Sequence, residues 1–191
     1  MDKIILYVPS SIDNVHFVSD VTESFARSII TFGNKKLEAD FMNDVKLIMY
    51  ELFSNCVLHG YTDNIKVTYG LEDEHMIIEM EMKGKGFMIK PVKSTSGEEI
   101  DNYYPPYPQK IHGKEFILYN DPENQVLCKV LGEKELFFFH KKVNSEEESL
   151  DNIPEHYGIL LITSLSKHFS YKRTNEGVDT FLLKKSVKDF I

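Results

Sequence analysis

A single long helical pattern with a polar stripe constrains the fold of this chain most. Apolar residues recur at helical spacing over residues 37–59, and Gly60 follows where a glycine commonly ends a helix. Three polar residues in this pattern stand four positions apart and therefore share one face of the predicted helix: Glu51, Asn55 and His59. Their neighbours are largely apolar, so the stripe interrupts a helix that is otherwise typical of a core.

The stripe has the chemistry of a magnesium and phosphate site, although its spacing alone does not establish one. Mg²⁺ prefers a few protein oxygens together with water and substrate phosphates, and the amide oxygen of Asn55 is such a ligand. A carboxylate one turn away, that of Glu51, can orient or deprotonate a hydroxyl nucleophile. A solvated helix face explains most arbitrary Glu-x-x-x-Asn pairs, so both interpretations stay open on spacing alone.

Other periodicities in the chain predict two more helices and several strands. One helix is expected over 13–32, capped by Asp13 or a nearby serine and ended by Gly33, and another over 158–168. Alternating or β-branched runs predict strands over residues 3–8, 65–71, 76–82, 114–119, 125–131, 134–143, 169–173 and 178–185. This order predicts an α+β fold, a two-layer α/β sandwich with a mostly antiparallel sheet and helices on one face.

The end of the long helix carries a family resemblance. The segment Glu51-Leu52-Phe53-Ser54-Asn55-Cys56-Val57-Leu58-His59-Gly60-Tyr61 resembles the N-box of the GHKL superfamily, which includes histidine-kinase ATPase domains, gyrase-type ATPases and anti-sigma-factor serine kinases. Its ending His-Gly-Tyr looks most like the anti-sigma branch. The resemblance implies a Bergerat-type fold in which Asn55 holds Mg²⁺ and Glu51 is the general base. It also places His59 in the nucleotide-binding set, with a polar cap at the helix end as the alternative.

A second stretch is similar to the family motif Asp-x-Gly-x-Gly-Phe. It reads Met82-Lys83-Gly84-Lys85-Gly86-Phe87, with Met82 in place of the aspartate. The resemblance implies that Gly84 and Gly86 line the nucleotide, although a plain turn also explains both glycines. In the family the aspartate accepts a hydrogen bond from the adenine amino group, whereas a thioether is a weak acceptor. A donor left unpaired against Met82 would cost about 1–3 kcal/mol, so the motif predicts impaired adenine recognition.

Two further segments match family motifs in part. His156-Tyr157-Gly158-Ile159 keeps one glycine of Gly-x-Gly-Leu, a motif whose backbone N–H groups cradle phosphates at a helix start. Gly177 followed by Thr180 on the last strand is similar to the family's placement of a threonine near the phosphates. The resemblance therefore adds Gly158 and Thr180 to the nucleotide-binding set. An ordinary helix start and an ordinary strand threonine explain them as well.

The resemblance covers residues 1–92 and 155–185 of a single predicted domain, 1–191. Between them, residues 93–154 are expected to form a β-rich insertion in place of the short ATP lid of the family. The Tyr/Pro-rich segment 103–108 and the run Phe137-Phe138-Phe139 are aromatic enough for an interaction surface. Packing within the inserted hairpin explains the phenylalanine run at least as well.

Composition narrows the functional classes. The formal net charge is −8, which disfavours nonspecific nucleic-acid binding. Two cysteines, Cys56 and Cys128, make no disulfide framework, and reduced, packed thiols are expected. No apolar run approaches the roughly 20 residues that span a bilayer, so no membrane association and a cytoplasmic location are expected.

Two functional hypotheses follow, with ATP and Mg²⁺ as the expected cofactors of the first. In the first, the protein is an anti-sigma-factor-like regulator that binds ATP and phosphorylates a serine on an antagonist protein in a partner-switching pathway. In the second, it is an inactive protein-binding regulator on the same fold. A sigma factor or its antagonist is the expected partner. The family resemblance also implies that the protein can form a homodimer. An unrelated α+β domain with a chance N-box is the third alternative.

Overall fold

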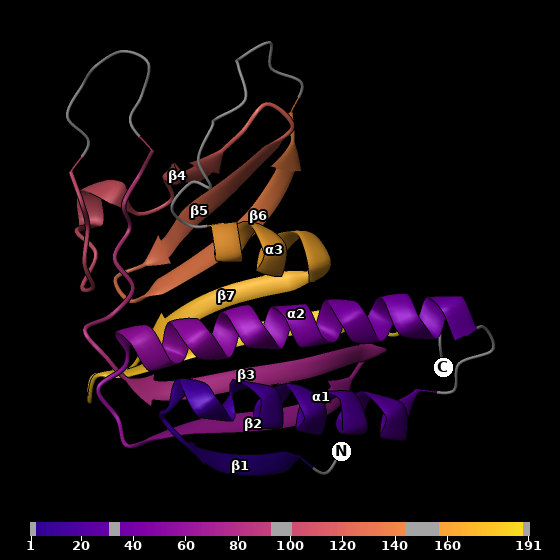
Figure 1. Ribbon diagram of the computed structural model, residues 1–191. Coiled ribbons are helices and arrows are strands. Elements are labelled where there is room, and N and C mark those ends of the chain that lie inside the picture. Colours follow the sequence, from indigo (N-terminus) through magenta and orange to yellow (C-terminus); the bar gives the residue numbers. More distant parts are fainter. Residues whose placement is uncertain (1–2, 31–34, 93–100, 144–156, 189–191) are drawn as a thin grey trace.

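The computed structural model describes residues 3–30, 35–92, 101–143 and 157–188. Within these residues, eight strands form one antiparallel sheet in the order β1-β2-β3-β8-β7-β6-β5-β4 (Figure 1). The strands are β1 (Ile4–Pro9), β2 (Asn64–Glu72), β3 (His75–Lys83), β4 (Glu115–Asn120), β5 (Asn124–Gly132), β6 (Glu135–Lys142), β7 (His168–Arg173) and β8 (Val178–Ser186).

The helices lie together on one face of this sheet. They are α1 (Val15–Ile29), α2 (Lys35–His59) and α3 (Tyr157–Leu165), and α2 packs between the other two (Figure 1). This arrangement confirms the predicted α+β sandwich with an antiparallel sheet. No helix among the described residues is long and apolar enough to cross a membrane.

One predicted cap is confirmed and one predicted helix end differs. Of the two predicted alternatives, Asp13 or a nearby serine, it is the serine Ser11 that caps the chain before α1: its Oγ accepts from the backbone N–H of Asp13 in a short 3₁₀ turn, Ile12–Asn14. The helix predicted over 158–168 ends at Leu165, because the N–H of Lys167 donates to the carbonyl of Lys184 on β8. Residue 168 therefore already belongs to β7. The predicted terminator of the first helix, Gly33, lies outside the described residues.

The core lies between the helices and the inner face of the sheet. On β3, Met76, Ile78, Met80 and Met82 are buried, whereas the residues between them are only half-buried. The same alternation recurs along β8, β7 and β5. Helix α2 closes the core from above with fully buried apolar residues, among them Ile48, Met49, Leu52 and Phe53. A strand that alternates in this way fixes which of its side chains can reach a site under the helices.

The strands of residues 115–142 continue the same sheet. Strand β6 pairs with β7, with Leu136 opposite Tyr171 and Phe138 opposite Phe169. The phenylalanine run is divided by strand alternation: Phe138 is 2% exposed, whereas Phe137 and Phe139 are half-buried on the other face, where their rings stack 6.0 Å apart. Core packing therefore explains the middle phenylalanine, and the two flanking rings lie on the helix-free face.

Replacing Phe138 by alanine tests whether β6 shares the core of the whole domain. Its ring centroid lies 5.0 Å from that of Phe169, so Phe138→Ala is expected to lower the free energy of unfolding by about 3–5 kcal/mol within one transition. Phe139→Ala removes the same atoms from the other face and is expected to cost less. Urea denaturation followed by circular dichroism measures both; equal losses, or a separate early transition, would contradict the shared core.

Candidate functional site

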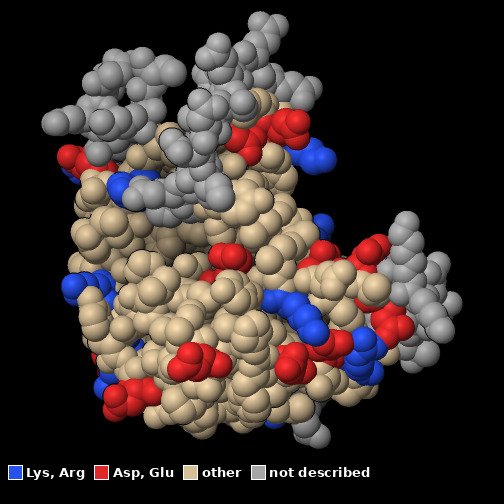
Figure 2. All heavy atoms as spheres, in the orientation of Figure 1, with Lys and Arg blue, Asp and Glu red and all other residues tan. Residues whose placement is uncertain are grey.

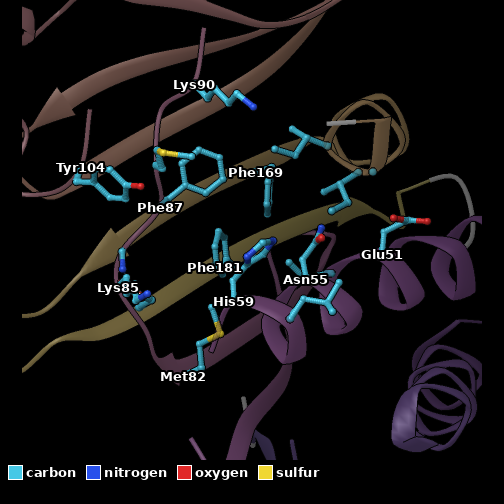
Figure 3. Close-up of a pocket in the computed structure, with 18 of the residues that line it drawn as sticks. Glu51, Asn55, His59, Met82, Lys85, Phe87, Lys90, Tyr104, Phe169 and Phe181 are labelled. Carbon is cyan, nitrogen blue, oxygen red and sulfur yellow. The ribbon is translucent and has the colours of Figure 1, made fainter. Parts of the chain in front are cut away.

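The predicted polar stripe opens into a cavity between the helices and the sheet. Glu51, Asn55 and His59 line a cavity of about 560 Å³, within the range of roughly 300–1,000 Å³ that is usual for small-molecule sites (Figure 3). The space-filling view shows the helical face with acidic and basic residues scattered over it rather than gathered in one basic patch (Figure 2). The lining and volume of the cavity show that the structure brings the three stripe residues together at a ligand-sized site.

One end of this cavity is polar and lies between α2 and the start of α3. Gly158, the second residue of α3, faces the stripe: a Cβ built there would lie 2.5 Å from Oε2 of Glu51 and 3.6 Å from Nδ2 of Asn55. A side chain at residue 158 would therefore require the end of the Glu51 side chain to move. Burial raises the pKa of Glu51, which brings this carboxyl nearer to the range in which a general base works well.

The side chains of Asn55 and His59 are open to a ligand. Asn55 is half-buried and His59 is exposed at the mouth of the cavity, and neither side chain makes a hydrogen bond with any described residue. In the part of the chain that the structure describes, no group of three His, Cys, Asp or Glu residues is placed to hold a metal ion. Any metal in this cavity would depend on Asn55 and on oxygens of the ligand itself.

The other end of the cavity is apolar and aromatic. Phe87, Phe169 and Phe181 line it together with Met82, and the rings of Phe169 and Phe181 stack with centroids 5.9 Å apart (Figure 3). Lys85 lies over the ring of Tyr61 at 5.1 Å from its centroid, at the edge of the same region. Flat, apolar surfaces of this kind suit a planar ring.

The two glycines after β3 are required by contacts within the protein. Gly84 does not line the cavity; a side chain there would collide with the Asp179 carboxylate. Gly86 lines the cavity and has φ +90, a conformation that favours glycine, and a side chain there would meet Pro105. A simple turn is therefore an incomplete explanation, because each glycine makes room for a specific neighbour.

Residues 101–111 contribute Tyr104 to the cavity lining and support the glycine loop, Gly84–Phe87, from behind. Tyr107 is buried with its hydroxyl donating to the carbonyl of Phe87 at 2.7 Å. The contact of Pro105 with Gly86 adds to this support. The Tyr/Pro-rich segment therefore packs against the glycine loop, while Tyr104 itself stays 52% exposed.

Asp179 on β8 was missed by the sequence prediction and organises the floor of the cavity. It is 2% exposed, and its Oδ1 accepts from the Tyr171 hydroxyl at 2.7 Å and from Nη1 of Arg173 at 2.5 Å. Its Oδ2 accepts from the backbone N–H of Gly86 at 3.1 Å, and Nη2 of Arg173 donates to the Gly84 carbonyl at 2.9 Å. Burial alone would lower the pKa of Arg173, but the hydrogen bond and charge of Asp179 outweigh it and raise that pKa.

Thr180, which the sequence analysis placed in the nucleotide-binding set, does not line the cavity. Thr180 follows Asp179 along β8 and so points to the opposite face, where its register partners are Glu81 and Lys172. Asp179 and Phe181 face the cavity instead. The alternation of β8, with Phe181 and Leu183 buried, was the available signal, since it places residue 179 on the inner face. His156, which the partial phosphate motif included, lies outside the described residues.

The two cysteines are packed thiols, as expected. Both are free and buried. Burial, with a smaller contribution from the charge of Asp179, raises the pKa of Cys56 to about 12. Burial also raises the pKa of Cys128. Neither thiol therefore supplies a reactive thiolate near neutral pH.

The fold and the cavity define a class of domain. It is an α+β sandwich whose longest helix presents a carboxylate and an amide to a ligand cavity, with a glycine loop at the opposite wall. Residues 8–184 match the family model described as a histidine kinase-like ATPase domain, and the chain belongs to this family. The alternative of an unrelated domain with a chance N-box is therefore wrong. Comparison with curated proteins gives no match.

Gly158→Ala separates helix propensity from the close contact with Glu51. Propensity alone would make alanine in α3 more stable by about 1 kcal/mol. The contact with the Glu51 carboxylate, which must shift to make room for a Cβ, opposes this gain, so Gly158→Ala is expected to be no more stable than the native protein. Gly132→Ala is the control, because a Cβ there meets nothing within 4 Å. Denaturant unfolding of both variants decides between the two, and a more stable Gly158→Ala protein would contradict the contact.

Glu51 also predicts a pH dependence of stability. Burial raises its pKa above the ordinary value of 4.5, so the folded chain holds this proton more tightly than the unfolded chain. Its contribution is then greatest below about pH 4.5 and is lost as the pH rises through the folded-state pKa. Relative to Glu51→Gln, the native protein is expected to lose stability as the pH rises above about 4.5.

Glu72 is a control of opposite sign for this titration. A hydrogen bond from Lys184 lowers the pKa of Glu72, so its contribution is lost as the pH falls. The native protein is therefore expected to gain stability relative to Glu72→Gln as the pH rises toward about 4.5, and the difference should be constant above that value. Urea unfolding of the three proteins at a series of pH values measures both differences; a rising difference for Glu51→Gln would show that this carboxyl is not penalised by burial.

Proposed function

We propose that this protein binds ATP with Mg²⁺ in the cavity beside α2 and acts as a regulatory nucleotide-binding domain. The observation that carries the proposal is the juxtaposition of Glu51, Asn55 and Gly158 at one end of a ligand-sized cavity, in a chain of the histidine kinase-like ATPase family. The aromatic end suits a base, and the polar end lies where a triphosphate would extend.

The residues present fit a magnesium nucleotide. Mg²⁺ is commonly held by one or two protein oxygens, with water and substrate phosphates completing its shell. The amide of Asn55, which has no partner among the described side chains, would supply that oxygen. Bound Mg²⁺ would neutralise charge on the phosphates. The first turn of α3 approaches this point closely at Gly158.

A serine kinase activity follows from the same site. Glu51 has a raised pKa and lies at the polar end, so it can accept a proton from a hydroxyl presented by a partner protein. The His59-Gly60-Tyr61 ending of the N-box supports the anti-sigma branch. We therefore place the protein in a partner-switching pathway, with a sigma factor or its antagonist as partner. A cytoplasmic location and a homodimer complete this proposal.

One observation favours a second candidate, a protein-binding regulator without normal ATP binding. Met82 is 6% exposed and lines the cavity at the position where the family motif has a carboxylate. Residues 101–111 already pack against the glycine loop. In this second candidate they take over part of the role that a mobile lid would have at the site. The cavity then has only a structural role, and the protein acts by binding a partner protein through its surface.

Titration calorimetry with ATP in excess Mg²⁺ separates the two candidates. Saturable binding is expected, and Asn55→Ala, which removes a direct metal ligand, is expected to weaken it by about tenfold or more. Asn64→Ala, an exposed change at the start of β2, is the matched control and should bind as the native protein does. In EDTA the native protein and Asn55→Ala should differ little. Absence of binding at millimolar nucleotide would leave the second candidate.

A further inference from the structure

The floor of the cavity holds a buried carboxylate directly across from Met82. In the register of β3 and β8, Met82 pairs with Asp179, and both side chains line the cavity. Directly paired residues of neighbouring strands project from the same face with their Cβ atoms about 4.5–5.5 Å apart. The carboxylate that the glycine motif lacks on β3 is therefore present one strand away, on β8.

Asp179 has one hydrogen-bond acceptor position without a donor among the described residues. An ionised carboxylate has about four lone-pair positions on its two oxygens. Tyr171 and Arg173 occupy Oδ1, and the Gly86 N–H occupies one position on Oδ2. No donor among the described residues fills the remaining position on Oδ2, and Asp179 lines the cavity although it is 2% exposed. Gly84 packs against the same oxygen, since a Cβ built there would lie 2.4 Å from Oδ2.

The surroundings determine which ligand group can use this position. The nearby wall is apolar and aromatic, formed by Phe87, Phe169 and Phe181. Arg173 pairs with the carboxylate, and Asp179 is the acceptor in its hydrogen bonds with Tyr171, Arg173 and Gly86. A planar base entering this end meets an acceptor that requires an N–H group, and a carbonyl oxygen placed there would face a negative charge.

We infer that Asp179 is the base-recognition residue of this site, accepting a hydrogen bond from the exocyclic amino group of a bound purine. The inference rests on the proposed nucleotide binding and deepens it by naming the residue that selects the base. Recognition is then supplied by β8 in place of β3, and Met82 contributes only apolar contact beneath the ring. Specificity follows because hypoxanthine has a 6-oxo group instead of the amino group. The Asp179 acceptor would then have no 6-amino donor to pair with.

A merely structural role for Asp179 makes a different prediction. If the carboxylate did no more than hold the glycine loop through Gly86, its loss would weaken every purine nucleotide equally. The ratio of affinities for two purines is therefore the decisive readout, because loop damage that affects both ligands cancels in it.

The test is calorimetric titration of the full chain with MgATP, MgITP and the magnesium triphosphate of unsubstituted purine riboside. The native protein is expected to bind ATP at least about tenfold more tightly than ITP, with unsubstituted purine between them. Asp179→Asn is expected to reduce the ATP-to-ITP ratio to about one, because the amide can present either a donor or an acceptor. Thermal unfolding checks that each variant is folded.

Asp121→Asn is the matched control. Asp121 also holds a loop, accepting from the backbone N–H groups of Glu123 and Asn124, but it does not line the cavity. This variant is expected to keep the native ATP-to-ITP ratio. Equal affinity of the native protein for ATP and ITP would overturn the inference and leave nucleotide binding standing, as would a tenfold preference retained in Asp179→Asn. No binding of any of the three triphosphates would overturn the proposed function and the inference with it.

Discussion

The buried carboxylate of Asp179 holds together the parts of the chain that make the cavity. It binds Arg173 and Tyr171 on β7 and the backbone of Gly86 in the glycine loop. The Tyr171 hydroxyl accepts from the N–H of Phe87, whose carbonyl in turn accepts from Tyr107. A buried charge is tolerated only when it is paired and hydrogen-bonded, so this network keeps β7, β8, the loop and residues 101–111 in one arrangement.

The two ends of the cavity are built by different means. At the polar end, two helices approach closely at Gly158, and Glu51 and Asn55 reach the cavity from successive turns of α2. At the aromatic end, the sheet supplies the floor, since alternate residues of β7 and β8 face inward. A ligand spanning both ends would therefore contact the helix layer with one part and the sheet with the other.

The fold was largely predictable from the sequence because helix and strand periods are local signals. The stripe on α2 follows from four-residue spacing, and the alternation of Met76, Ile78 and Met80 identified β3. Asp179 was not predictable in its role, because its pairing with Met82 depends on register between strands far apart in the sequence. Thr180 was assigned to the site by a motif match. The alternation of inward and outward residues along β8 decides which face Thr180 points to, and this alternation was readable from the neighbouring residues.

The three strands β4, β5 and β6 also move the free edge of the sheet away from the cavity. Without them β7, which carries Phe169 and Tyr171, would be an edge strand with unpaired backbone groups open to strand addition by another chain. In the observed sheet that edge is β4 instead, a strand of six residues with a register shift between Ile117 and Tyr119. Short, irregular edges are poor templates for pairing, so the added strands protect the floor of the cavity against aggregation.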